Sequence, residues 1–276
     1  MPPMELTSLH HAVLRLLRPL IRMLIRRGVS YSEFADLARR VFVEVADEDF
    51  RLDQRKQSVS RISMLTGIQR KEVSHIRKHP VDEDTSLRQS YNRSARVISG
   101  WRRDSAFTDQ SGHPLSLPFS GDVSFSELVR RYSGDIPARA VLDELARVGS
   151  VEQDDTQHIR LVGDGAHVVR GGDAAYQVLG MAAADLMGSI DHNLESTPED
   201  SRLQLTVAYD NLSADAVRRF KQLSHEQSMS LLHRMDDWLA EQDRDSNPDA
   251  GSADDERHRA GIGIYFFEEP YEDDDS

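Results

Sequence analysis

The apolar positions between Gln57 and Lys78 follow a helical spacing that is interrupted at one glycine. Gly67 divides the stretch into two short segments, and it suits a turn that needs a positive φ at the end of a first helix. The apolar residues recur three or four positions apart, which places them on one buried side. They are Ile62, Leu65, Ile68, Val73 and Ile76. The pattern predicts a helix, a tight turn and a second helix.

A helix-turn-helix that binds DNA places its second helix in the major groove. The face opposite the apolar set carries side chains that hydrogen-bond base edges and phosphates. The candidates for the groove are Gln69, Arg70, Lys71, Ser74 and His75, and those for phosphates are Arg55, Lys56, Arg77 and Lys78. An ordinary helical hairpin with a solvated basic face is the alternative interpretation of the same pattern.

Two helices are expected before this motif. The first runs from Thr7 or Ser8 to about Arg27, and a proline inside it, Pro19, should kink or divide it. The second begins after Ser30, with Glu33 completing a capping box. Its predicted buried stripe is Phe34, Leu37, Ala38, Val41, Phe42 and Val45. We expect both helices to pack on the motif, because a helix-turn-helix alone buries too little surface to be stable.

The middle of the chain predicts a winged-helix-like unit. After a connecting helix that ends near Trp101, residues 104–121 read as an irregular linker rich in Gly, Pro and Ser. Two helices follow, the second opening at Pro137, and then two short strands, 151–153 and 158–162. The second of these helices carries as many acidic as basic side chains, namely Arg139, Asp143, Glu144 and Arg147. We therefore expect a structural or partner-binding role for this unit.

The C-terminal part predicts an α+β arrangement. A helix from Asp173 to about Leu194 precedes residues 202–209, whose apolar and polar side chains alternate as in a strand. A long helix then runs to about Gln242. Residues 243–256 have the acidic composition of a disordered insert, and residues 261–267 again read as a strand. The fold class expected is mainly α with minor β, with domains at 1–103, 104–170 and 171–276.

Charge is distributed unevenly along the chain. Residues 1–103 hold 20 Lys+Arg and 12 Asp+Glu, giving +8, although the whole chain of 276 residues carries −13. The remaining residues therefore carry −21. Such asymmetry suggests a part that binds nucleic acid joined to an acidic body that repels it.

Several classes of protein are disfavoured. The chain has no cysteine, so it has neither disulfides nor thiolate metal sites, which favours the cytoplasm. No run of about 18 apolar residues occurs, so a membrane partner is not expected. No phosphate-binding loop, nucleophile elbow or metalloprotease motif is present. We expect no catalytic site, no metal and no cofactor.

Five stretches carry a resemblance to a known family. They are LLRPLIRMLIRRGVSYSEFADLARRVFVEVA, RKQSVSRISMLTGIQRKEVSHI, GHPLSLPF, FSELVRRYSGDIPARAVLDELARVG and GIGIYFFEE. In these the chain resembles a bacterial domain-of-unknown-function family with an N-terminal helix-turn-helix. The resemblance implies an architecture and a regulatory role, but no ligand or target.

Together these features predict a transcriptional regulator that binds double-stranded DNA through its N-terminal helix-turn-helix. We also expect a homodimer held by the C-terminal part, because two half-sites double the contact with DNA. The alternative is a protein-interaction scaffold that uses the helix-turn-helix and winged-helix units without DNA. A steep fall of DNA affinity with rising salt concentration would favour the regulator over the scaffold, because phosphate contacts produce such a fall.

Overall fold

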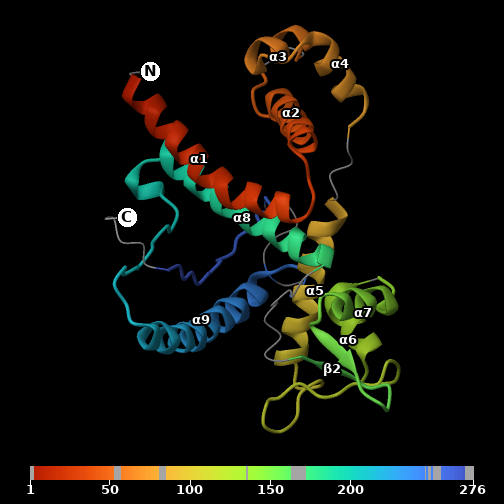
Figure 1. Cartoon of the computed structure of the whole chain (residues 1–276). Coiled ribbons are helices and arrows are strands. Elements are labelled where there is room, and N and C mark those ends of the chain that lie inside the picture. Colours follow the sequence, from red (N-terminus) through yellow and green to blue (C-terminus); the bar gives the residue numbers. More distant parts are fainter. Residues whose placement is uncertain are drawn as a thin grey trace. The chain divides into compact units, whose positions relative to one another are not determined.

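The computed structural model describes residues 3–52, 57–80, 85–134, 136–162, 172–245, 247, 250 and 256–270. These residues are mostly helical, with one two-stranded sheet. The prediction of a mainly α fold with minor β is therefore confirmed. The chain divides into two compact units, Met1–Glu83 and Asp84–Ser276, whose elements are labelled in Figure 1.

The first unit consists of α1 (Pro3–Arg26), α2 (Tyr31–Glu48), α3 (Val59–Thr66) and α4 (Arg70–Lys78). The expected capping box opens α2, since the Ser30 hydroxyl accepts a hydrogen bond from the backbone of Glu33 and the Glu33 carboxylate accepts one from the backbone of Ser30. The core lies between α2, α3 and α4. Its buried side chains are Val43, Ala46, Ile62, Val73 and Ile76.

Three expectations for this unit are wrong. The α2 helix packs through Val43 and Ala46, whereas most of the stripe that was predicted to be buried is exposed. In α3, Leu65 was also predicted to be buried and is exposed. The exposed members of the predicted sets are Leu37, Val41, Phe42, Val45 and Leu65. Among the described residues, α1 contributes none to this core, and it runs unbroken through Pro19. The core of this unit is small, so a wide apolar stripe on α2 need not all be buried.

The second unit begins with α5 (Thr85–Arg103), which the sequence suggested was a connecting helix. Its side chains Val97, Ile98 and Trp101 are buried in a core shared with α6 (Phe125–Ser133) and α7 (Ala138–Arg147). The boundary between the two units falls after Glu83 in the sequence, so α5 belongs to the second unit and not to the end of the first.

A small sheet completes the predicted winged-helix layout. Strands β1 (Val151–Gln153) and β2 (Ile159–Leu161) pair antiparallel with Val151 opposite Leu161. Leu117, from the segment between α5 and α6, bridges to Ile159 on the other edge of β2. Along the chain the unit thus consists of α5, the bridging residue Leu117, α6, α7 and the hairpin of β1 and β2. The linker expected at 104–121 is thus part of the domain.

Helices α5 and α6 approach each other closely at a glycine. A Cβ atom placed on Gly100 would lie 2.3 Å from Cδ2 of Tyr132. The Tyr132 hydroxyl donates a hydrogen bond to the Asp104 carboxylate at 3.1 Å, which holds the ring against the helix. The close approach therefore depends on the absence of a side chain at position 100.

The C-terminal part contains α8 (Gly172–Glu195), a short 3₁₀ helix (Pro198–Asp200) and α9 (Ala214–Gln242). Neither 202–209 nor 261–267 forms a strand in this structure. Among the described residues, neither segment has a backbone–backbone hydrogen bond to a neighbour, and a strand is defined by its partner. The predicted insert at 243–256 lies largely outside the described residues.

Candidate nucleic-acid interface

The turn between α3 and α4 has the geometry that its sequence predicts. Gly67 has φ +72°, and its backbone N–H donates to the carbonyl of Ser63 at 3.0 Å, which ends α3. The Thr66 hydroxyl donates to the carbonyl of Ile62 at 2.8 Å and accepts from the backbone of Ile68 at 3.2 Å. These bonds satisfy backbone groups that the turn would otherwise leave unpaired.

The α4 helix buries one face and exposes the other. Val73 and Ile76 face the core. At about 100° per residue, Lys71, Ser74, His75 and Lys78 lie on the opposite side of the helix, and Arg70 lies on the flank beside them. Of the predicted residues, Gln69, Arg70, Lys71, His75 and Lys78 are exposed and Ser74 is half-buried. Gln69 precedes the helix in an extended conformation, and its side chain makes no capping hydrogen bond. The structure thus brings together one continuous polar face.

Polar contacts from α2 hold α4 in place near both of its ends. Arg39 lies 3.8 Å from the Glu72 carboxylate, which belongs to the first turn of α4. Near the end of the helix, Arg40 donates to the backbone carbonyl of His79 at 2.6 Å. These contacts fix the rotation of α4 about its axis, and so they determine which of its side chains are presented outward.

Arg77 differs from the other predicted phosphate contacts. Its Nε atom lies 2.8 Å from Oδ2 of Asp47 on α2, and the two side chains are only 32% and 19% exposed. Arg77 therefore ties α4 to α2 within the unit. Helical periodicity places Arg77 on the same flank as Arg70, so spacing alone could not have separated it from the groove candidates.

Gln57 has a structural role that sequence reasoning did not identify. Its side chain is buried, and Nε2 donates to the carbonyl of Ala46 at 2.6 Å and, more weakly, to that of Phe50 at 3.4 Å. The amide thus joins the end of α2 to the start of α3. No spacing rule marks such a residue, because an amide before a helix usually lies in solvent. The remaining phosphate candidates, Arg55 and Lys56, lie outside the described residues.

His75 and His79 form a further contact on α4. Their ring centroids lie 4.5 Å apart, and Nδ1 of His79 lies 2.9 Å from the carbonyl oxygen of His75. Across the part of the chain that the structure describes, no group of three or more His, Cys, Asp or Glu residues could hold a metal ion. Both rings are exposed and extend the polar face of α4 to its C-terminal end.

The corresponding helix of the second unit, α7, presents charges that cancel. Arg139 lies 3.3 Å from Asp143, and Arg147 lies 2.7 Å from Glu144. On the neighbouring α6, hydrogen bonds from Arg130 and Arg131 lower the pKa of Glu127 to about 2. The basic side chains of these helices thus have carboxylate partners, in contrast to those at the outer face of α4.

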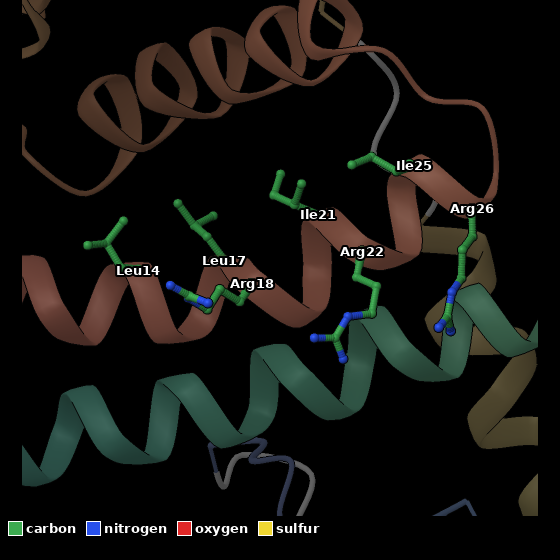
Figure 2. A pocket seen from close by; sticks show the side chains of 7 residues that line it. All are labelled: Leu14, Leu17, Arg18, Ile21, Arg22, Ile25 and Arg26. Carbon is green, nitrogen blue, oxygen red and sulfur yellow. The ribbon is translucent and has the colours of Figure 1, made fainter. Parts of the chain in front are cut away.

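A surface hollow lies beside α1. Figure 2 shows the side chains of Leu14, Leu17, Ile21 and Ile25 on one side of the helix, with Arg22 and Arg26 pointing to the other. Its lining contains no carboxylate, hydroxyl or imidazole. It therefore lacks the groups that acid–base or nucleophilic catalysis requires. Of the helices described, none is long and apolar enough to cross a membrane.

Comparison with known proteins identifies a family. No curated protein and no solved structure matches the chain. Residues 6–274 match a family of unknown function, DUF6502. This range includes all five stretches on which the resemblance was based, as well as the whole of α2, α3 and α4. Because the match spans nearly the entire sequence, the chain belongs to the DUF6502 family.

Proposed function

We propose that this protein is a DNA-binding transcriptional regulator, and not an enzyme, that acts in the cytoplasm. The observation that supports the proposal is the outer face of α4, where Arg70, Lys71 and Lys78 project from a helix held by α2. Within the described residues none of these three cations forms an ion pair. Cations without carboxylate partners are available to phosphates and to guanine edges.

The charge of the two units is consistent with this role. Residues 1–83 contain 15 Lys+Arg and 11 Asp+Glu, giving +4, and the remaining 19 and 36 give −17. A duplex is attracted to the first unit and repelled by the second. We propose that Gln69, Ser74 and His75 contribute base contacts beside Arg70 and Lys71. In the same proposal Lys78, Arg55 and Lys56 contact phosphates, and the protein binds as a homodimer.

The test compares two double variants that remove the same charge. Arg70→Ala with Lys71→Ala alters the outer face of α4, whereas Arg218→Ala with Arg219→Ala alters α9 in the second unit. Affinity for genomic DNA fragments is measured over a range of salt concentrations. Each lost phosphate contact lowers the slope of log K against log salt by about 0.9, so the α4 variant should lose up to about two such increments. A lost base contact would additionally reduce discrimination between sequences by about 1–3 kcal/mol.

The α9 variant should keep the affinity and the slope of the original protein. Equal behaviour of the two variants would contradict the assignment to α4. Absence of any salt-dependent binding by the full-length protein would contradict the DNA-binding function itself. Circular dichroism of each variant verifies that the fold is retained.

A second candidate function is favoured by the exposed apolar face of α2. Leu37, Val41 and Phe42 are all exposed. Large apolar side chains grouped on the surface of one helix often mark a protein interface. In this alternative the unit is a scaffold for a protein partner. Replacement of Phe42 by Ser would then abolish capture of that partner, while Arg70→Ala with Lys71→Ala would leave it intact.

A further inference from the structure

Two segments in the second unit have the chemistry of strands without a sheet. In residues 202–209 the apolar side chains alternate with polar or small ones, and all of the apolar ones are exposed. The exposed fractions are 74% for Leu203, 85% for Leu205, 78% for Val207 and 79% for Tyr209. Such alternation is that of a strand with one face on a partner. The partner of this face is missing within the described chain.

The second segment, 261–267, consists of glycine and apolar residues, and its large side chains divide between two faces. Tyr265 and Phe267 are 63% and 48% exposed and lie on one face, with ring centroids 6.3 Å apart. Ile264 and Phe266 lie on the other face and are 42% and 37% exposed. Phe266 contacts the Phe220 ring of α9, with centroids 6.0 Å apart. The face that carries Tyr265 and Phe267 is therefore the outward one.

Both segments are anchored to helices. The side chain of Asn193 on α8 accepts from the backbone N–H of Arg202 at 2.7 Å and donates to its carbonyl at 3.0 Å. Before the second segment, Arg259 makes two hydrogen bonds to Asp185 of α8, at 2.7 and 2.8 Å. These anchors tie one end of each segment to α8. Between the anchors, neither segment makes a backbone–backbone hydrogen bond within the described chain.

An extended segment with free backbone groups and an apolar face is a template for pairing with another chain. We propose that the occupant is a second copy of this protein, with residues 202–209 of one copy pairing antiparallel with residues 261–267 of the other. In a two-fold dimer this pairing occurs twice, because each copy supplies both segments. The inference rests on the proposed homodimer and specifies its contacts.

Charge complementarity determines the orientation. Arg202 precedes the first segment's apolar residues and Asp210 follows them, whereas Arg257 and Arg259 precede the second segment and Glu268 follows it. Antiparallel pairing brings Arg202 toward Glu268 and Asp210 toward the arginines. Parallel pairing would place charges of the same sign together, which is destabilising.

The alternation of side chains determines the register. The apolar face of 202–209 must lie on the same side as the outward face of 261–267, so odd-numbered residues must pair with odd-numbered ones. Setting Arg202 opposite Glu268 satisfies this condition. Leu203 then faces Phe267, Leu205 faces Tyr265, and Thr206 faces Ile264 on the opposite side. Tyr209 faces Gly261, where the absence of a side chain leaves room for its ring.

The absence of cysteine in the natural chain allows a direct test. Two differently tagged full-length copies, one with Thr206→Cys and the other with Ile264→Cys, are produced together and oxidised without DNA. Opposed residues of paired strands have Cα atoms about 4.5–5.5 Å apart, a separation that a disulfide spans. The expected product is a disulfide-linked dimer that carries both tags. The control replaces Thr206→Cys by Ser201→Cys, which the register places away from Ile264, and it should not cross-link.

Light scattering on the unmodified protein separates the possible failures. A dimer without the Thr206–Ile264 cross-link would overturn the strand pairing while retaining the homodimer. A monomer at micromolar concentration would overturn both. Cross-linking equal to that of the Ser201 control would also overturn the register. None of these results bears on DNA binding by α4, which is measured separately.

Discussion

Arg77 and Lys78 are neighbours of equal charge to which the structure gives different roles. Arg77 joins α4 to Asp47 of α2, with 2.8 Å between Nε and Oδ2, whereas Lys78 is exposed on the outer face. Replacing each by Ala in the full-length protein removes the same charge from adjacent positions. We expect Arg77→Ala to loosen the first unit and Lys78→Ala to weaken DNA binding without loosening it.

The magnitude follows from the geometry of the pair. A hydrogen bond to a charged group contributes about 1.5–3 kcal/mol, and partial exposure of both side chains reduces this to about 1–2 kcal/mol. The variant also leaves the Asp47 carboxylate half-buried without its cation, while its Oδ1 atom has no hydrogen-bond partner among the described groups. A loss of 1–2 kcal/mol corresponds to a factor of about 5–30 in the local opening equilibrium.

Native-state hydrogen exchange followed by mass spectrometry measures this opening. Peptides from α2 and α4 should lose protection by that factor in Arg77→Ala, while peptides from α6 and α7 serve as an internal control. In Lys78→Ala protection should remain, and the salt slope of DNA binding should fall by about 0.9. Unchanged protection in Arg77→Ala, or an equal loss in Lys78→Ala, would refute the division of roles.

Two further predictions concern the turn and the acid response. Gly67→Val should destabilise the first unit by about 1 kcal/mol or more, because a β-branched residue is strained at φ +72°; an unchanged melting temperature and unchanged exchange in α3 would contradict this. Hydrogen bonds from Arg130 and Arg131 lower the pKa of Glu127 to about 2 in the folded state, below its unfolded value of about 4.3. Its stabilising contribution is therefore present above about pH 4.3 and is lost as the pH falls toward 2. Glu127→Gln should accordingly make the melting temperature of the second unit fall less steeply between pH 5 and 2, and a curve parallel to that of the original protein would count against the pairing.

The sequence predicted local structure best where one residue type determines the backbone. The positive φ at Gly67 and the capping box at Ser30 and Glu33 are both present, because each depends on residues that are close in the chain. The two-stranded hairpin was expected for the same reason. The bridge from Leu117 to β2 was not, since a single residue between two helices gives no periodic signal.

Burial was predicted less well than helicity. The apolar stripe of α2 contains more residues than the small core of the first unit contacts, so Leu37 and Phe42 are exposed. At the candidate interface, periodicity found the outer face of α4 but not the residues that hold it. Gln57 and Asp47 act through tertiary contacts with α2 and α4, and sequence spacing carries no information about which distant backbone an amide or carboxylate meets.

The close approach at Gly100 has a consequence for the history of the family. The space that a side chain would need at this position is filled by the Tyr132 ring. The ring is held in place because the Tyr132 hydroxyl donates a hydrogen bond to the Asp104 carboxylate. Enlarging one residue therefore requires reducing the other, so the positions corresponding to 100 and 132 should change together among relatives. Separate substitutions at either position would pass through a poorly packed intermediate. The contact thus couples two sites in evolution that lie 32 residues apart in the sequence.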